Sequence, residues 1–338
     1  MQGGKMRRSY GRKIWICLVL GLFWQWLIFL SPAVALGPGE VLLEKPAPEE
    51  EKEGKKEAAP CTCGPLISDS CLPIETHKAS LQVLWALSVV GGNFTPNWRK
   101  VSAKGDFYTF SMPVKFTYGP VKDLETYVIV PYIHNFAANL DSSLAGPNGE
   151  RSANYGGIGD ITMVGKYLLL PETAVRPAVT GVAGVGFPSG HASHLNPGRL
   201  GTDAVGAGAV TFTTGVNLYK WLKPFLVYSN IWLSTPVNLF TSRDDAVRSR
   251  EFVTFNLAAE LPLTEKWVAL LEMYSTWTWS NISTPQGFQS PSTLVGILPG
   301  IEYFLSEKLA VSAGAAIDLF GKAGSVKYTP IFTVYYSF

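Results

Sequence analysis

Over most of the chain, apolar and polar side chains alternate with a period of two. The clearest case is segment 326–338, where Tyr328, Phe332 and Phe338 share one face and Thr329 lies on the other. This pattern is typical of β-strands with an apolar medium on one side and a polar one on the other. At the open edge of a soluble sandwich, so apolar a face would promote aggregation, whereas in a closed transmembrane barrel it contacts lipid.

Twelve segments show this alternation, and each can supply the ~9–11 residues of a membrane-spanning β-strand. They span residues 79–92, 106–119, 124–136, 157–170, 176–187, 204–221, 224–236, 249–262, 266–279, 292–305, 308–320 and 326–338. An even number of strands is typical of bacterial single-chain barrels. We therefore predict an all-β fold, a twelve-stranded antiparallel, up-and-down outer-membrane β-barrel over residues 79–338.

The connections between these segments alternate in length, and the alternation predicts an orientation. Short turns are expected at 120–123, 171–175, 222–223, 263–265 and 306–307. Longer loops rich in Gly, Ser and Asn are expected near 93–105, 137–156, 188–203, 237–248 and 280–291, and only the last loop, 321–325, is short where a long one would be regular. Short turns face the periplasm in outer-membrane barrels, so both termini are expected to be periplasmic.

The first 35 residues have the features of an export signal. Basic residues within 5–13 precede an apolar run, 14–30, and the small-residue sequence Ala33-Val34-Ala35 follows. This arrangement predicts a signal peptide over 1–35, cleaved before Leu36, with an uncleaved anchor as the alternative. We expect the mature protein in the outer membrane of a Gram-negative-type bacterium, and disulfides can form in exported proteins.

Two segments separate the signal from the barrel. Residues 36–60 are rich in Pro, Glu and Lys and have few large apolar groups, so we expect a disordered linker that acts as a spacer or a tether. Residues 61–78 regain apolar side chains such as Leu66, Ile67 and Leu72. This cysteine-containing segment is expected either to extend into the periplasm or to plug the barrel lumen.

Three mature cysteines, Cys61, Cys63 and Cys71, lie in that segment. Either Cys61 or Cys63 could form a disulfide with Cys71, or all three could be thiols, whereas a Cys61–Cys63 bridge would be strained. His77 is near enough to complete a metal site, but the spacing matches no zinc pattern. We expect no metal and no cofactor.

Composition excludes other classes of protein. The chain has 28 Lys+Arg and 26 Asp+Glu, a net charge of +2, and no basic face that would bind nucleic acid. Beyond the signal region, no apolar run approaches the ~18–20 residues that a spanning helix needs, which excludes a polytopic helical membrane protein.

The barrel interior is expected to carry charge, because a charged side chain that faces lipid costs up to ~2–4 kcal/mol at mid-bilayer. Residues opposite the apolar stripe are therefore lumen-lining candidates: Lys115, Asp160, Lys166, Glu260, Glu272, Glu302 and Asp318. The register of 124–136 is ambiguous, so Glu125 is assigned to neither face. These charges could line a polar conduit, or they could neutralise one another in a closed barrel.

Two stretches carry a resemblance to a known family. The first stretch is Gly156-Gly157-Ile158-Gly159-Asp160-Ile161-Thr162, which runs into Lys166-Tyr167-Leu168. The second is segment 110–119, followed by 125–132. They resemble the outer-membrane transporter and channel family named for the MetA pathway of phenol degradation. The resemblance implies a channel that passes small aromatic or apolar solutes by passive diffusion. Residues 36–78 have no counterpart in this resemblance.

Other functions remain as alternatives. One is a closed structural or adhesive barrel that acts through its extracellular loops. Another is a lipid-active enzyme, for which His134, Ser189, His191, Ser193 and His194 are the only candidates and show no hydrolase signature, so we expect no enzyme. Expected partners are outer-membrane lipid, a small-molecule solute and the barrel-assembly machinery, which would bind the C-terminal strand with Phe338 as its insertion signal.

Overall fold

The computed structural model describes residues 62–237, 239, 250–279, 282–284 and 287–338, all within one compact unit, Ala59–Phe338. The predicted signal peptide 1–35, the linker 36–60 and Cys61 lie outside the described residues, as does most of the expected loop 237–248. No helix in the described part of the chain is long and apolar enough to cross a membrane.

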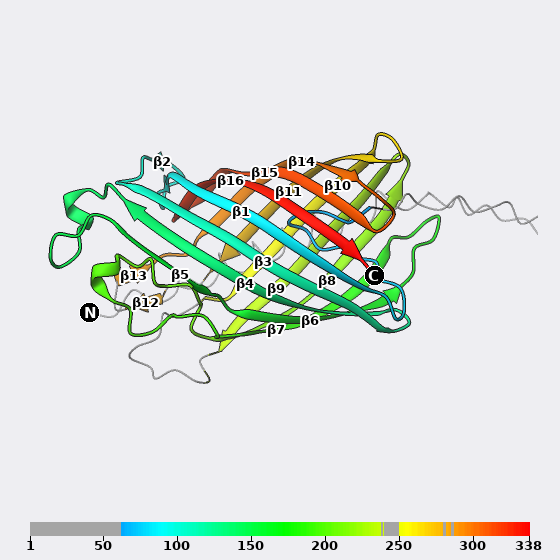
Figure 1. Ribbon diagram of the computed structural model, residues 1–338, viewed down its shortest axis with the longest axis horizontal. Coiled ribbons are helices and arrows are strands. Elements are labelled where there is room, and N and C mark those ends of the chain that lie inside the picture. The colour runs from blue at the N-terminus through cyan, green and yellow to red at the C-terminus, as the bar shows by residue number, and fades with distance from the viewer. Residues whose placement is uncertain (1–61, 238, 240–249, 280–281, 285–286) are drawn as a thin grey trace, which may run out of the picture. The chain divides into compact units, whose positions relative to one another are not determined.

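The described residues form β-strands joined by turns and loops (Figure 1). The strands are β1 (Ala79–Phe94), β2 (Lys100–Val101), β3 (Asp106–Val121), β4 (Leu124–Ala138), β5 (Ala153–Ile158), β6 (Ile161–Leu170), β7 (Ala178–Phe187), β8 (Val210–Leu222), β9 (Phe225–Val237), β10 (Phe252–Pro262), β11 (Trp267–Thr278), β12 (Ile282–Thr284), β13 (Gly287–Gln289), β14 (Thr293–Phe304), β15 (Leu309–Lys322) and β16 (Gly324–Ser337). Two short 3-10 helices, η1 (Ser142–Leu144) and η2 (Pro197–Arg199), lie in loops.

These strands close into an antiparallel barrel. Neighbours in sequence pair along the wall, and β16 pairs with β1, with Val334 opposite Val83. β5 and β6 pair with successive parts of β4 and together form one wall strand. The wall therefore has twelve strands, which confirms the predicted fold, while β2 and the β12–β13 hairpin belong to loops.

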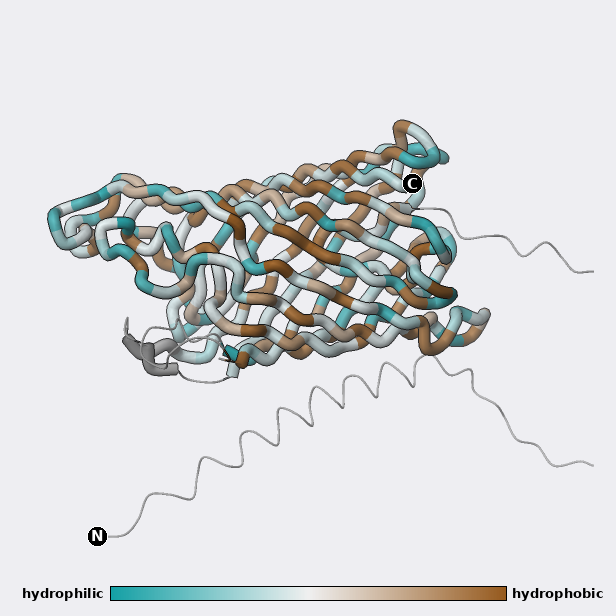
Figure 2. Tube along the Cα trace, turned by 60° about the horizontal axis from the view of Figure 1, so that its bottom comes forward, coloured by the Kyte–Doolittle hydropathy of each residue, from teal (hydrophilic) through white to brown (hydrophobic). Residues whose placement is uncertain are grey.

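The period-two pattern separates the two faces of the wall. On β16, Phe332 is 44% exposed on the outer face, whereas Ile331 and Thr333 are buried inside. In Figure 2, brown apolar positions alternate with paler ones along the wall, and the strongest teal lies in the loops and turns at its ends. Many large apolar side chains thus face outward, and the barrel interior holds the polar residues together with buried apolar clusters such as Leu270, Leu298 and Ile331.

Two strands depart from their predicted bounds by four or more residues. The predicted strand 157–170 begins earlier, at Ala153, and is interrupted at Gly159 and Asp160. A Cβ on Gly159 would lie 2.8 Å from Ile133 Cδ1 and 3.1 Å from the Val205 carbonyl oxygen, so a larger residue there would crowd its neighbours. The predicted strand 204–221 begins only at Val210, because residues 202–207 belong to a loop bonded to the inner side of the wall: the Asn135 side chain donates to the carbonyls of Thr202 (2.9 Å) and Ala204 (3.3 Å).

The start of β1 and the end of β16 meet at one end of the wall. The Phe338 amide donates to the Ala79 carbonyl (2.9 Å), and the Ser337 amide donates to the carbonyl of Lys308 in the β14–β15 turn (2.8 Å). The short turns lie at this end, which we call the short-turn end. Its periplasmic orientation stays a prediction.

Candidate functional site

We call residues 62–78 the luminal segment. Most of it lies inside the barrel, where the blue trace of Figure 1 runs between the walls, and residues 75–78 are exposed. The segment meets β3 at the short-turn end, where the His77 amide donates to the Gly119 carbonyl (2.7 Å) and the Gly119 amide donates to the Lys78 carbonyl (3.1 Å). From there it bonds to inward-facing residues of β4, β6, β7, β8, β9, β11 and β14.

Two glutamates from adjacent strands hold the first half of the luminal segment. Glu272 on β11 accepts hydrogen bonds from the amides of Leu66 (2.6 Å), Ile67 (3.1 Å) and Ser68 (2.7 Å). Glu302 on β14 accepts one from the Cys63 amide (2.9 Å). Both side chains are fully buried. Carboxylates that accept main-chain N–H bonds satisfy donors that burial would otherwise leave unpaired.

The third glutamate of this wall is Glu260 on β10. Its Oε2 accepts a hydrogen bond from the Tyr228 hydroxyl (3.0 Å), and the same hydroxyl lies 3.2 Å from Thr62 Oγ1. Glu260 is also fully buried. It therefore contacts the start of the luminal segment through Tyr228.

Apolar contacts support the same half. Leu66 is buried in a cluster with Leu270, Leu298, Ala316 and Ile331, which come from β11, β14, β15 and β16. Burial of a leucine side chain contributes roughly 1.5–3 kcal/mol. The inner wall thus provides an apolar socket beside Glu272.

Asp69 is the centre of the second half. Its carboxylate lies 3.3 Å from Lys115 Nζ and 3.2 Å from Lys166 Nζ, and it accepts a hydrogen bond from Asn217 Nδ2 (3.0 Å). Its main chain makes two bonds with the Asn230 side-chain amide, at 2.8 and 2.9 Å. Burial would raise the pKa of the Asp69 carboxyl, but Lys166 and Lys115 outweigh burial and hold it below its usual value. Asp69 is therefore a carboxylate anion.

Lys166 links this carboxylate to a second one. Its Nζ lies 2.8 Å from Glu125 Oε1, and it donates to the Ser70 carbonyl (2.9 Å). Glu125 also accepts a hydrogen bond from the Ile74 amide (2.9 Å). The structure thus settles the register that the sequence left open, because Glu125 faces inward and is buried.

Cys71 is a buried thiol and not part of a disulfide. Its sulfur lies 3.2 Å from Thr180 Oγ1 and 3.3 Å from the Asn217 carbonyl. Burial raises the pKa of the Cys71 thiol to about 11. Cys71 packs against barrel residues such as Ala178 and Tyr228 and is not bridged to Cys63, whereas Cys61 lies outside the described residues. Within the described ranges, no three His, Cys, Asp or Glu side chains lie together as a metal site.

The remaining lumen-lining candidates stabilise the wall and its loops. Asp318 accepts hydrogen bonds from the Tyr274 hydroxyl (2.9 Å) and the Lys327 amide (2.7 Å). Asp160 accepts from the amides of Gly190 (3.0 Å) and Ala207 (2.7 Å), which fixes loop 188–209 to the wall. Of the seven candidates, Lys115, Lys166, Glu272 and Glu302 bond directly to the luminal segment, Glu260 reaches it through Tyr228, and Asp160 and Asp318 do neither.

Three of the five residues considered for catalysis make other contacts. Ser189 Oγ donates to the Gly159 carbonyl (2.8 Å), and His191 Nδ1 lies 3.0 Å from the Asp203 carbonyl. His134 stacks on Phe136 with ring centroids 4.1 Å apart. These side chains shape the loop end of the barrel.

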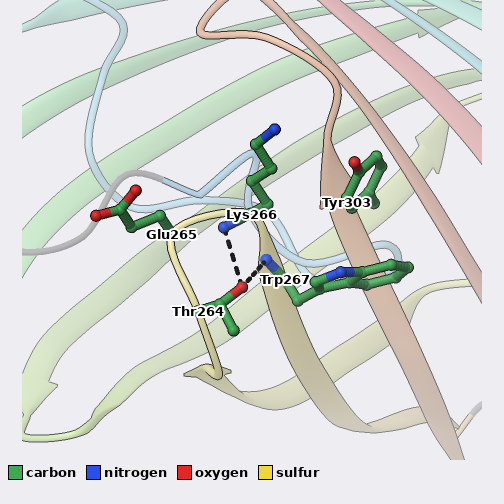
Figure 3. Close-up of a pocket in the computed structure, with 5 residues that line it drawn as sticks. All are labelled: Thr264, Glu265, Lys266, Trp267 and Tyr303. Atoms are coloured by element: carbon green, nitrogen blue, oxygen red, sulfur yellow. Dashed lines mark hydrogen bonds between the residues drawn. The ribbon is translucent and has the colours of Figure 1, made fainter.

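A surface pocket at the β10–β11 turn lies apart from the luminal segment (Figure 3). Thr264 Oγ1 accepts from the amides of Lys266 (3.2 Å) and Trp267 (3.0 Å), and the rings of Trp267 and Tyr303 lie 4.5 Å apart. Aromatic pairs at the end of a barrel wall are typical of the membrane interface. Phe338 is similarly exposed and contacts Tyr336 edge to face, with ring centroids 5.0 Å apart.

Sequence reasoning missed several residues of the site: Asp69, Glu125, Thr180, Asn217 and Asn230. Asn217 and Asn230 are directly opposite each other on β8 and β9. Two side-chain amides that face inward at paired positions indicate that the wall binds a main chain. The sequence does not show this pairing until the strand register is known.

Comparisons with known proteins identify a family and similar barrel folds. A family model described as "Putative MetA-pathway of phenol degradation" matches residues 86–323. No curated protein matches the chain. Among solved structures, an outer membrane channel from Pseudomonas putida F1 is similar with a TM-score of 0.63 and 12% identity, over 80% of this chain and 99% of that one. The translocator domain of autotransporter NalP from Neisseria meningitidis has a TM-score of 0.45 and 10% identity, over 78% and 89% of the two chains.

Proposed function

The chain belongs to the MetA-pathway family of phenol degradation, and from this premise we propose that it is an outer-membrane channel for small aromatic or apolar solutes. Solutes cross by passive diffusion through a narrow, charged lumen. The observation that carries this proposal is the closed barrel with an apolar outer wall and buried charged groups that face an internal chain segment. We infer the aromatic class of solute from the family, whose description names phenol degradation.

The luminal segment is the plug of this channel. Its hydrogen bonds and ion pairs to eight of the twelve wall strands support this role, and we expect part of the segment to move before a solute passes. The barrel proper is 79–338, and 61–78 is the plug that precedes it. Residues 1–35 export the chain as a signal peptide, and 36–60 are the linker.

The membrane placement completes the proposal. The short-turn end, with both chain ends of the barrel, faces the periplasm. The barrel-assembly machinery recognises the last strand, with Phe338 as the insertion signal. The exposed aromatic residue at this end and the outward apolar face of β16 support that role. We assign no catalytic role, since Ser189 and His191 bond to main-chain carbonyls.

Solute flux tests the channel function. The full chain is expressed in the outer membrane of a bacterial host that lacks it, and toluene uptake by these cells is compared with that of cells without it and of cells with an unrelated closed barrel. Purified mature protein from Leu36 is used for the planar bilayer. We expect uptake above both controls, and discrete openings in a planar bilayer. A folded, heat-modifiable barrel that gives neither uptake nor openings would contradict the channel function.

That negative result would favour the second candidate, a closed structural or adhesive barrel. One observation supports it: loop 188–209 is fixed to the wall through Asp160 and Asn135, while the luminal segment fills the other end. A barrel of this kind would bind partners through its extracellular loops.

A further inference from the structure

The Asp69 carboxylate occupies a binding site that the barrel wall builds from three strands. We propose that Lys115, Lys166 and Asn217 form a carboxylate-binding site of the channel, that Asp69 is its resident competing ligand, and that the solutes include small aromatic carboxylates such as benzoate. This inference rests on the proposed channel function and names one class of its solutes.

The geometry of the site fits a carboxylate from any source. Lys115 on β3 and Lys166 on β6 contact different Asp69 oxygens, Oδ1 at 3.3 Å and Oδ2 at 3.2 Å. Asn217 on β8 donates to Oδ2 at 3.0 Å. Hydrogen bonds from charged donors to a carboxylate are about twice as strong as neutral ones. None of the three donors belongs to the luminal segment, so the site stays on the wall when Asp69 leaves.

The charge of the site requires an anion. Lys115 and Lys166 bring two positive charges, and Glu125 on the wall brings one negative charge at 2.8 Å from Lys166. Asp69 brings the second negative charge, so the four side chains together are neutral. Without Asp69, one positive charge would be left uncompensated beside a fully buried Lys166, which is costly. An incoming carboxylate removes that cost.

The surroundings of the site favour an aromatic ring on the ligand. Lys115 Nζ lies 4.0 Å from the centroid of the Tyr127 ring. Tyr127 is buried with Val164 and Val182, and Trp232 packs against this cluster. Trp232 Nε1 also donates to Asn217 Oδ1 (2.7 Å), which joins the cluster to the site. A charged contact point beside an apolar, aromatic wall is typical of sites for amphipathic small molecules.

Competition follows from this arrangement. Asp69 is also held by its main chain through Asn230, so an external carboxylate binds only when Asp69 withdraws. The apparent affinity for the external ligand is reduced by the fraction of molecules in which the site is vacant. Conversely, bound ligand favours the displaced state of the luminal segment by the same coupling free energy.

The test compares benzoate with uncharged benzyl alcohol, titrated calorimetrically into the full mature protein in detergent. For Asp69→Ala we expect benzoate to bind about tenfold more tightly than to the wild type, equivalent to ~1.4 kcal/mol. Benzyl alcohol affinity is expected to be unchanged. A second substitution, Lys115→Met in the Asp69→Ala background, should remove the gain. Asp141→Ala, at an exposed loop carboxylate, is the matched control and should bind as the wild type does.

An unchanged benzoate affinity in Asp69→Ala would overturn the inference. So would an equal gain for benzyl alcohol, which would mean that the substitution only loosens the luminal segment. If Asp69→Ala does not fold, Asp69→Asn keeps the size of the side chain, removes its charge and is judged by the same criteria. Toluene uptake by the wild type tests the channel function separately, so its failure is distinguishable from a failure of benzoate binding.

Discussion

The two halves of the luminal segment are held in different ways. In residues 62–68 the barrel recognises main chain, because Glu272 and Glu302 accept hydrogen bonds from four amides. In residues 69–74 it also binds main chain, through Asn230, Lys166 and Glu125, but it adds two side-chain contacts, to the Asp69 carboxylate and the Cys71 thiol. The polar contacts of the first half are mostly to main chain, whereas the second half adds an ionic contact that depends on one acidic residue, Asp69.

This difference indicates a division of roles. Main-chain recognition by buried glutamates anchors the segment, since each lost acceptor leaves a buried donor unpaired. Side-chain recognition at Asp69 uses a site that another anion can occupy. We therefore expect the anchor to set whether the lumen is filled, and the Asp69 site to set which solutes displace the segment.

Removing the anchor should have the largest effect. In Glu272→Ala three buried amides lose their acceptor, and each unpaired donor costs ~1–3 kcal/mol. We expect the luminal segment to leave the wall and single-channel conductance to rise well above that of the wild type. Glu265→Ala, an exposed carboxylate in the β10–β11 turn, is the control. A conductance equal to the wild type in a folded Glu272→Ala barrel would show that Glu272 is not the anchor.

Breaking the charge network should come next. Lys166→Met leaves Asp69 and Glu125 without their shared partner, and removal of one member of a buried ion pair costs ~3–5 kcal/mol. Chemical unfolding followed by gel mobility measures the loss. Lys220→Met serves as the comparison, because Lys220 pairs with Glu172 at 3.2 Å near the surface and such pairs contribute about 0–1 kcal/mol. Equal losses in the two variants would contradict the central position of Lys166.

Acid should loosen the second half before the first. Since the folded pKa of Asp69 lies below 3.8, this carboxylate adds stability above that value, and the stability is lost as pH falls through the folded pKa. We expect proteolysis of the luminal segment to increase in this acidic range for the wild type. In Asp69→Asn this part of the pH dependence should be absent. If the variant and the wild type show the same acid dependence, another group controls the release.

The smallest effect concerns thiol reactivity. Because the thiolate reacts and the pKa of Cys71 is raised from 9.0 to about 11, maleimide should label this thiol slowly at neutral pH. The folded thiol adds stability below pH 9.0 that is lost as pH rises through about 11. In a Cys61→Ser, Cys63→Ser background, labelling should accelerate over that range, and also at neutral pH once Glu272→Ala is added. Rapid labelling of the otherwise unchanged protein at neutral pH would mean that Cys71 is accessible.

Much of the barrel could be predicted from the sequence, because lipid and lumen impose a strict period of two on each strand. The exceptions have physical reasons. Glu125 had no clear face because Tyr127 and Ile129 make the inner side of β4 as apolar as the outer side. The predicted start of β8 was too early. Residues 202–207 carry small side chains that fit a strand, yet the carbonyls of Thr202 and Ala204 accept hydrogen bonds from Asn135 inside the barrel.

The contents of the lumen could be predicted only in part. Burial of charge selected residues such as Lys166, Glu272 and Glu302, since a charge cannot face lipid. The sequence did not reveal what these side chains bind, because their partners are main-chain amides that look alike in every sequence. Asp69 was missed for a related reason: its importance comes from two lysines far along the chain.

The most direct test of the account is to lock the luminal segment in place. Cys71 Sγ lies 3.2 Å from Thr180 Oγ1, so Thr180→Cys in a Cys61→Ser, Cys63→Ser background can form a disulfide between the segment and β7. Toluene uptake is then measured before and after reduction, with the cross-link verified by mass. We predict that the oxidised barrel admits no toluene and that reduction restores uptake to the level of the unlocked protein. Equal uptake in the oxidised and reduced states would contradict the claim that this segment closes the channel.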